Sequence, residues 1–341
     1  MDIFTFMDTL PPRTFPAHDL VGDLWLNTDP LALHALRGRV IMLFFWDFAC
    51  GRSLSLLGAV QEWYSRYGPY GLVVLGVHSP KFPFSGDPAR VRKEALRIGV
   101  SLPVVVDRSL QVWSRYACTT WPTILLIDAD GYVRFRSEGH RGSRSVEQTL
   151  RYLLHEADPM QGLPDPGPSL DRGAPDDPEH GAADEIYAGY GRGSIGNIEG
   201  VVPESTLIYT DPGLYVPGRI YLDGPWLCLR ESVRSGGAAS AVVAYAGRQA
   251  HLVLGCDGPA SMELAVSVDG QSLGAERSGS DIHLHPSGES TLLVSEPRLY
   301  RVAFHPTVGS HRLRIACRES GLKLYAVSFM AAMLPDIISR N

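Results

Sequence analysis

Residues 40–53 read VIMLFFWDFACGRS, and this stretch decides the fold of the first half of the chain. Its continuous apolar run, residues 40–45, predicts a strand that is buried on both faces. Apolar side chains at helix-like spacing follow from Ser53 to Tyr67, so we expect the strand to lead into a helix. Cys50 stands where this helix begins, and the unpaired N–H groups and the dipole of a helix N-terminus stabilise a thiolate. The stretch therefore predicts a nucleophilic cysteine between a buried strand and a helix.

The residue three positions after Cys50 limits the chemistry of this cysteine. Ser53 stands where a Cys-x-x-Cys redox motif would have its second thiol. A hydroxyl cannot close a disulfide, so Cys50 either works alone or uses a second thiol from elsewhere. The role that we expect of Ser53 in the catalytic site is a hydrogen bond from its hydroxyl to the Cys50 thiolate, without a redox role of its own. Arg52 favours the thiolate form, whereas Asp47 opposes it with a nearby negative charge. The plainer interpretation is an unreactive, half-buried cysteine with Ser53 as an ordinary residue of the first helical turn.

Length and composition narrow the class of protein. A chain of 341 residues with 45% hydrophobic residues predicts two domains. The net charge of −6 gives no reason to expect a nucleic acid as partner. Five cysteines are a sparse and odd number, which argues against a disulfide framework and for a free thiol. The N-terminus is a poor signal peptide and no apolar run is long enough for a membrane span, so we expect no integral membrane segment and a cytoplasmic location.

A proline-rich stretch divides the chain near its middle. Residues 159–184 hold six prolines, four glycines and six acidic residues against one arginine, a composition typical of a solvated linker. The expected organisation is a domain over 1–157, a linker over 158–183, a second domain over 184–331 and a tail over 332–341.

The two halves have different patterns. The first alternates strands and helices and then ends in an antiparallel hairpin and a last helix, which predicts an α/β domain. Beyond the first strand and helix, we expect strands at 71–78, 102–107, 123–128 and 132–137, and helices at 87–98, 109–116 and 145–156. The second half shows only short strand-like runs, such as 241–245, 251–254, 262–268, 299–304 and 322–329. With Asp269-Gly270 as a hairpin turn, this half predicts an all-β, jelly-roll-like sandwich.

Four motifs in the first half connect it to a known family. They are FWDFACGRS at 45–53, GLVVLGVHSP at 71–80, YACTTWPT at 116–123 and LIDADG at 126–131. In this order and spacing they resemble the thioredoxin-like fold of the TlpA/DipZ type, among the AhpC/TSA redoxins. The resemblance implies a central mixed sheet flanked by helices and thiol–disulfide chemistry. It also implies an extracytoplasmic location as the alternative to the cytoplasm.

The second half resembles the β-domain of DipZ-type proteins, which is similar to a carbohydrate-binding module. The pieces that carry this resemblance are DEIYAGY at 184–190, GPW at 224–226, HLVL at 251–254, VDG at 268–270 and EPRLY at 296–300. The resemblance implies a binding domain, with a glycan as one expected partner. Trp226 and Tyr300 are aromatic side chains that would stack on a sugar if they were exposed, although a buried role is the favoured interpretation for each.

The resemblance also assigns residues around Cys50. Pro122 corresponds to the cis-proline of the fold, and the backbone of Trp121 would pair with an extended substrate beside the sulfur. Trp46, Phe48 and Trp121 would form an aromatic rim for substrate binding, together with Arg52, or would equally be core residues.

Two further positions bear on the missing thiol. Cys118 lies four residues before Pro122 and could act as the resolving thiol, although a small packed side chain is the plainer interpretation. Lys81 follows the second strand where DipZ types usually have an acid.

Three functions compete. The first is a thiol–disulfide oxidoreductase or isomerase that forms mixed disulfides at Cys50 with protein or small thiols. The second is a redox-inactive binding or scaffold protein on a thioredoxin frame. The third is a thiol peroxidase, but such peroxidases have a threonine where Asp47 stands. We expect no metal, since no cluster has metal-ligand spacing, and no nucleotide cofactor, since no phosphate-binding glycine motif follows a strand.

Overall fold

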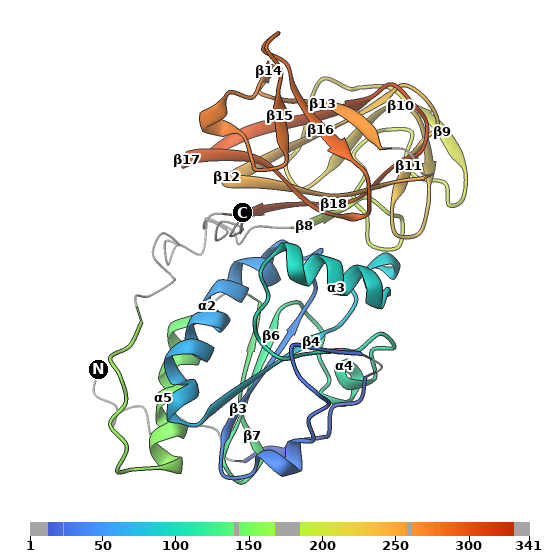
Figure 1. Cartoon of the computed structure of the whole chain (residues 1–341). Coiled ribbons are helices and arrows are strands. Elements are labelled where there is room, and N and C mark those ends of the chain that lie inside the picture. The colour runs from blue at the N-terminus through green and yellow to red at the C-terminus, as the bar shows by residue number, and fades with distance from the viewer. Residues whose placement is uncertain (1–12, 23, 140–142, 168–184, 258–260, 331–341) are drawn as a thin grey trace. The chain divides into compact units, whose positions relative to one another are not determined.

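The computed structural model describes residues 13–22, 24–139, 143–167, 185–257 and 261–330 (Figure 1). These residues form two compact units, and the division between the units falls within the proline-rich stretch of the sequence. Each unit is described by itself below.

The N-terminal unit is built on a mixed sheet of seven strands in the order β1-β7-β6-β3-β4-β5-β2. The strands are β1 (Phe15–Pro16), β2 (Leu24–Leu26), β3 (Val40–Trp46), β4 (Leu72–His78), β5 (Val104–Val106), β6 (Thr123–Ile127) and β7 (Tyr132–Glu138). The central strands β3, β4 and β5 run parallel, and β6 and β7 complete the sheet as an antiparallel hairpin beside β3. Every residue of β3 is buried, as its continuous apolar run predicts.

Four helices flank this sheet. They are α2 (Gly51–Tyr67), α3 (Pro88–Arg97), α4 (Gln111–Arg115) and α5 (Ser143–Ala157), with short 3-10 turns that include η4 (Pro83–Gly86). Helices α2 and α5 lie side by side (Figure 1), and Tyr67 of α2 donates a 2.7 Å hydrogen bond to Glu147 of α5. Asp87 caps α3 by accepting from the N–H of Ala89 at 3.1 Å. The α/β fold expected from the sequence is therefore confirmed.

The first residues of the expected linker belong to the N-terminal unit. Arg66 of α2 donates to the carbonyl of Asp165 at 3.0 Å, and Arg151 of α5 donates to the carbonyl of Pro164. The N–H of Gly167 donates to Glu147 at 2.9 Å. The chain therefore follows α2 and α5 beyond the expected boundary at residue 157. The rest of the expected linker and the expected tail lie outside the described residues.

The C-terminal unit consists of strands. They are β8 (Glu185–Tyr187), β9 (Thr206–Tyr209), β10 (Ile220–Cys228), β11 (Val233–Ser235), β12 (Ala239–Cys256), β13 (Met262–Val268), β14 (Gln271–Ser272), β15 (Ile282–Leu284), β16 (Ser290–Val294), β17 (Arg298–Cys317) and β18 (Leu322–Met330). The strand-rich second domain expected from the sequence is confirmed.

Two long strands organise this unit. The first half of β12 pairs with β10 and the end of β17, whereas its second half pairs with β18 and the start of β17. Register shifts between Gly247 and His251 mark the change of partners, as expected where a β-bulge bends a strand. The runs 241–245 and 251–254, expected as separate strands, are therefore parts of one strand. Asp269 and Gly270 form the expected turn, with φ of 55° and 79°.

The two aromatic side chains considered as sugar platforms are core residues. Trp226 and Tyr300 are both 0% exposed and belong to the central apolar cluster of the C-terminal unit. A ring without exposed surface cannot stack on a glycan, so these two residues give no support to the expectation of glycan binding.

The packing of β4 leads to a test of the N-terminal core. A Cβ at Gly76 would lie 2.8 Å from Leu102 Cδ1 and 3.1 Å from Trp46 Nε1. We expect Gly76→Ala to lower the free energy of unfolding by about 1–3 kcal/mol, because overpacking a dense core forces side chains apart. Gly162→Ala is the control, since no atom lies within 4 Å of its added Cβ.

The measurement is denaturant unfolding followed by tryptophan fluorescence. Five of the six tryptophans precede residue 130, so the signal reports mainly on the N-terminal unit. Equal unfolding midpoints for the two variants would contradict the packing described for β4.

Candidate active site

Cys50 lies in the turn between β3 and α2. It is the N-cap residue of α2, with extended backbone angles, and its side chain makes no capping hydrogen bond. Its N–H donates to the carbonyl of Asp47 at 3.1 Å, and its carbonyl accepts from Leu54 at 3.1 Å. The backbone of Cys50 is thus used by the turn and the helix, and the sulfur remains available for other contacts.

The sulfur of Cys50 contacts a lysine and a backbone carbonyl. Lys81 Nζ lies 3.6 Å from Cys50 Sγ, and the carbonyl oxygen of Trp121 lies 3.9 Å from the same atom. Cys50 is 1% exposed and Lys81 is 8% exposed. An ammonium group at this distance stabilises a thiolate, and it does so more strongly where water is excluded. Lys81 is therefore the cation in contact with the sulfur.

Sequence reasoning did not include Lys81 among the site residues. It noted only that a lysine stands where related proteins usually have an acid. That departure was the available signal, because a change of charge beside a reactive cysteine changes the stability of its thiolate. Arg52, the cation that the sequence favoured, is the second residue of α2, and its role in substrate binding stays a prediction.

Asp47 connects the two segments that form the site. Its carboxylate is fully buried and accepts from the N–H of Ala49 at 2.6 Å, from the N–H of Lys81 at 2.8 Å and from the hydroxyl of Ser85 at 2.5 Å. Buried carboxylates require such donors, because an unpaired buried charge is costly. Asp47 therefore fixes the turn before Cys50 relative to the loop that carries Lys81. The bond to Ala49 is an Asx turn, a local pattern that sequence reasoning could have used.

Ser53 is buried beneath the turn. The N–H of Asp47 donates to Ser53 Oγ at 3.4 Å, and this is the hydrogen bond described for that hydroxyl. The expected bond from Ser53 to the Cys50 sulfur is not the one observed, because the hydroxyl faces the backbone of the preceding turn. Its observed contact is structural.

Trp121 covers the site from the opposite loop. The Trp121–Pro122 peptide bond is cis. The indole N–H donates to the carbonyl of Ser79 at 2.8 Å, and the ring stacks on Trp113 with centroids 4.0 Å apart. Lys81 Nζ lies 6.0 Å from the centroid of the Trp121 ring, within the range of a cation–π contact. Trp121 thus keeps both its backbone and its ring beside the reactive groups.

The other two residues of the expected aromatic rim lie beneath the site. Trp46 and Phe48 are 0% exposed, so neither offers a surface to a substrate. Both rings pack on His78, at centroid distances of 5.1 Å and 5.4 Å, and Phe84 also packs against Phe48. They end up in the core because the loop after β4 covers the end of β3. Of the two roles that the sequence left open for Trp46 and Phe48, their burial favours the core role.

Cys118 lies in an apolar environment. It is buried in the cluster that contains Trp113, and its N–H donates to the Trp113 carbonyl at 3.0 Å. Burial raises the pKa of the Cys118 thiol to about 12, although Arg136 opposes the shift. All five cysteines are free. A thiol with so high a pKa is a poor nucleophile at neutral pH, so the structure favours the packing role over the resolving role.

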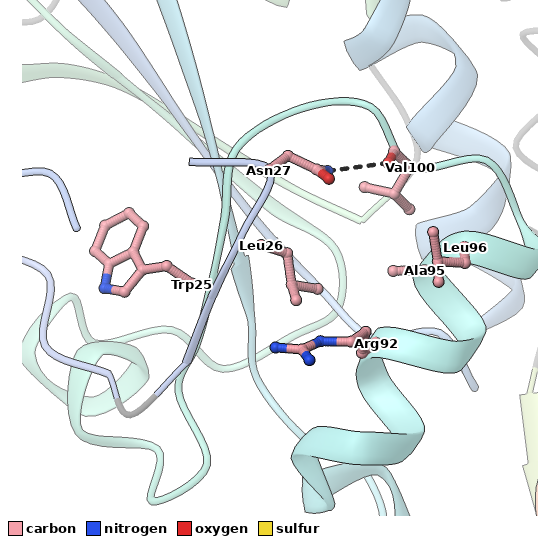
Figure 2. Close-up of a pocket in the computed structure, with 7 residues that line it drawn as sticks. All are labelled: Trp25, Leu26, Asn27, Arg92, Ala95, Leu96 and Val100. Carbon is pink, nitrogen blue, oxygen red and sulfur yellow. Dashed lines mark hydrogen bonds between the residues drawn. The ribbon is translucent and has the colours of Figure 1, made fainter. Parts of the chain in front are cut away.

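A hollow at the edge of the sheet lies apart from these residues. Seven residues of β2, α3 and their flanks line it, and Figure 2 shows them: Trp25, Leu26, Asn27, Arg92, Ala95, Leu96 and Val100. The Asn27 amide donates to the carbonyls of Val100 and Leu102 at 3.0 and 2.9 Å, so its donors are used within the protein.

The described part of the chain lacks two other kinds of feature. Over that part of the chain, no group of three or more His, Cys, Asp or Glu side chains could hold a metal ion. Among the helices that the structure describes, none is long and apolar enough to cross a membrane.

Comparisons with known proteins show which families the chain is similar to. Residues 15–136 match the model of the AhpC/TSA family, and residues 183–329 match the model of the thioredoxin-like C-terminal domain. Protein DipZ of Mycobacterium bovis is 32% identical over 248 residues, which are 71% of this chain and 35% of DipZ. The thiol-disulfide oxidoreductase ResA of Geobacillus thermodenitrificans is 31% identical over 118 residues, 34% of this chain and 64% of ResA. The chain thus spans less than two thirds of either relative.

Solved structures align with less than half of the chain. One is the crystal structure of a putative thiol:disulfide interchange protein DsbE from Chlorobium tepidum, at 22% identity and a TM-score of 0.37, covering 42% of this chain and 98% of that one.

The burial of His78 leads to a prediction about the stability of the N-terminal unit in acid. Burial lowers the pKa of His78, and the Asp47 carboxylate 3.9 Å away offsets this only in part. The unfolded state binds a proton at about pH 6.5 whereas the folded state does not, so stability is lost as the pH falls below that value. We expect a loss of up to about 1.4 kcal/mol per pH unit that disappears in His78→Leu.

The measurement is the free energy of unfolding by tryptophan fluorescence at pH 7, 6 and 5. His34→Asn is the control, because the His34 side chain is 75% exposed. If the wild type and His78→Leu lose stability equally below pH 6.5, another group is responsible.

Proposed function

We propose that this chain, which carries a thioredoxin-like domain of the AhpC/TSA family followed by a thioredoxin-like C-terminal domain, functions in thiol–disulfide exchange. The exchange uses one thiol, that of Cys50. The observation that carries the proposal is the 3.6 Å contact between Lys81 Nζ and Cys50 Sγ at the start of α2. A cation and a helix N-terminus both stabilise the thiolate, which is the form that attacks disulfides.

The first step forms a mixed disulfide. The Cys50 thiolate attacks one sulfur of a substrate disulfide, a new S–S bond forms, and the second substrate sulfur leaves as a thiolate that takes a proton. In a dithiol protein the second cysteine would then release the substrate. Because Ser53 cannot do so, an external thiol such as glutathione attacks the mixed disulfide and regenerates the Cys50 thiolate.

Access to the sulfur controls which disulfides react. Cys50 is 1% exposed, so the side chains of Lys81 and Trp121 must move before a protein disulfide can reach it. The Trp121 carbonyl, 3.9 Å from the sulfur, is available to pair with an extended substrate strand beside the reacting atoms. The substrates are therefore disulfides in extended, accessible segments or in small molecules.

The C-terminal domain and the cellular location complete the proposal. The C-terminal domain supplies contacts to the substrate protein, and a glycan remains a secondary candidate for its ligand. We place the reaction in the cytoplasm, where a reducing thiol pool would replace the missing second cysteine. In an extracytoplasmic location, which the resemblance to DipZ types implies, the reductant would be another protein.

One competing function has an observation in its favour. The near-complete burial of Cys50 also fits a redox-inactive protein that binds extended peptides at the Trp121 loop. A thiol peroxidase is less favoured, because Asp47 stands where such enzymes have a threonine and its carboxylate is already used by three donors.

The test is mixed-disulfide formation with oxidised glutathione at neutral pH, followed by intact-protein mass. We expect one glutathionyl group on the wild type, none on Cys50→Ser, and an unchanged rate for Cys118→Ser. Lys81→Met should react about tenfold more slowly, because it removes the cation beside the thiolate.

Ser53→Cys gives a complementary result. It restores a Cys-x-x-Cys motif, so we expect an intramolecular disulfide on oxidation, which the wild type cannot form between these positions, and faster reduction of insulin disulfides by dithiothreitol than with the wild type, whose mixed disulfide must wait for the external thiol. A wild-type Cys50 that takes up no glutathione would exclude the exchange function and leave the peptide-binding protein.

A further inference from the structure

Cys50 and Lys81 form a buried pair of side chains in which a sulfur contacts an amine nitrogen. The two reactive atoms are 3.6 Å apart, and both residues are more than nine-tenths buried. At 3.6 Å the nitrogen and the sulfur are in non-bonded contact, so no water molecule separates them. Ser53 occupies the position at which a Cys-x-x-Cys motif has its second thiol.

The backbone holds this pair in place. One oxygen of the Asp47 carboxylate accepts from Ala49, the residue before Cys50, and the other oxygen accepts from the N–H of Lys81 itself. Both partners are therefore anchored to the same carboxylate. Groups held in this way react with a high effective concentration, because the entropy of bringing them together is lost on folding.

We propose that Lys81 is the resolving nucleophile of this site and closes a covalent S–N bond to Cys50 after a hydroperoxide has oxidised the sulfur. The inference rests on the nucleophilic Cys50 of the proposed function and adds a modification site to it. The product is a sulfenamide between the two side chains.

The chemistry takes two steps. The Cys50 thiolate attacks the terminal oxygen of the hydroperoxide, an S–O bond forms, the O–O bond breaks, and the leaving alkoxide or hydroxide takes a proton. The neutral amine of Lys81 then attacks the sulfur of the sulfenic acid, an N–S bond forms, and the S–O bond breaks with loss of water. Sulfur is oxidised by two electrons and the hydroperoxide is reduced by two.

The environment favours both steps. Because Cys50 is 1% exposed, a small hydroperoxide needs less movement of the covering side chains than a protein disulfide does. The leaving alkoxide or hydroxide is a stronger base than an amine, so it takes its proton from the adjacent Lys81 ammonium and leaves Nζ neutral for the second step. Sulfenic acids are known to condense with thiols or with nitrogen, and here the nitrogen is the group in contact. An external thiol that attacks the S–N bond releases Lys81 and gives the mixed disulfide of the exchange reaction.

The test treats the full chain with a few equivalents of hydrogen peroxide and measures its mass under non-reducing conditions. We expect a loss of two hydrogens, reversed by dithiothreitol, and a tryptic product in which residues 40–52 are joined to residues 67–90, because trypsin does not cleave at a modified Lys81. Lys81→Arg is the matched variant: it keeps the positive charge but has no nucleophilic amine. It should form a sulfenic acid that dimedone traps and that proceeds to sulfinic acid.

The outcomes separate this inference from the proposed function. If the wild type is glutathionylated at Cys50 but hydrogen peroxide gives the same oxygen adducts as in Lys81→Arg, the exchange function stands and the S–N bond is excluded. If Lys81→Arg also loses two hydrogens, another group, such as a backbone nitrogen or a second thiol, closes the bond and Lys81 is not the resolving group. If Cys50 reacts with neither reagent, both proposals fail.

Discussion

The buried carboxylate of Asp47 is the constraint on which the site depends. Its three hydrogen bonds join the turn before Cys50 to the loop after β4, two segments more than thirty residues apart in the sequence. A carboxylate in this position is tolerated only because donors surround it, and removing them would leave a charge in the core. The distance between Lys81 and Cys50 follows from this arrangement, because hydrogen bonds to Asp47 hold both of the segments that carry these residues.

The same arrangement explains why the aromatic residues are distributed as they are. The loop that Asp47 holds carries Phe82 and Phe84, which close over Phe48 and the end of β3. Trp46 and Phe48 therefore support the turn from below, and Trp121 alone of the expected rim stays beside the sulfur. A polar anchor and an aromatic layer thus act together: one fixes the backbone, and the other excludes water from the cysteine.

The fold was largely predictable from the sequence, and the site was predictable only in part. Continuous apolar runs identified β3 and β4, and Asp87-Pro88 identified the start of α3, because these signals are local. Strand β2, with three residues, is too short to show a period. The contact between Lys81 and Cys50 joins residues that are distant in the sequence. Neither periodicity nor composition predicts where the end of a long side chain lies. The cysteine was found because a helix N-terminus is a local feature.

Ser53, a hydroxyl where a second sulfur would stand, has a kinetic consequence. In a dithiol protein, release of the substrate is a first-order step whose rate belongs to the protein alone. In this chain, under the proposed function, release is second order, and the lifetime of the mixed disulfide depends on how much free thiol surrounds it. The covalent complex would persist when thiols are scarce and dissolve when they are plentiful. The time for which such a protein stays bound to its substrate would therefore depend on the concentration of free thiol in its compartment.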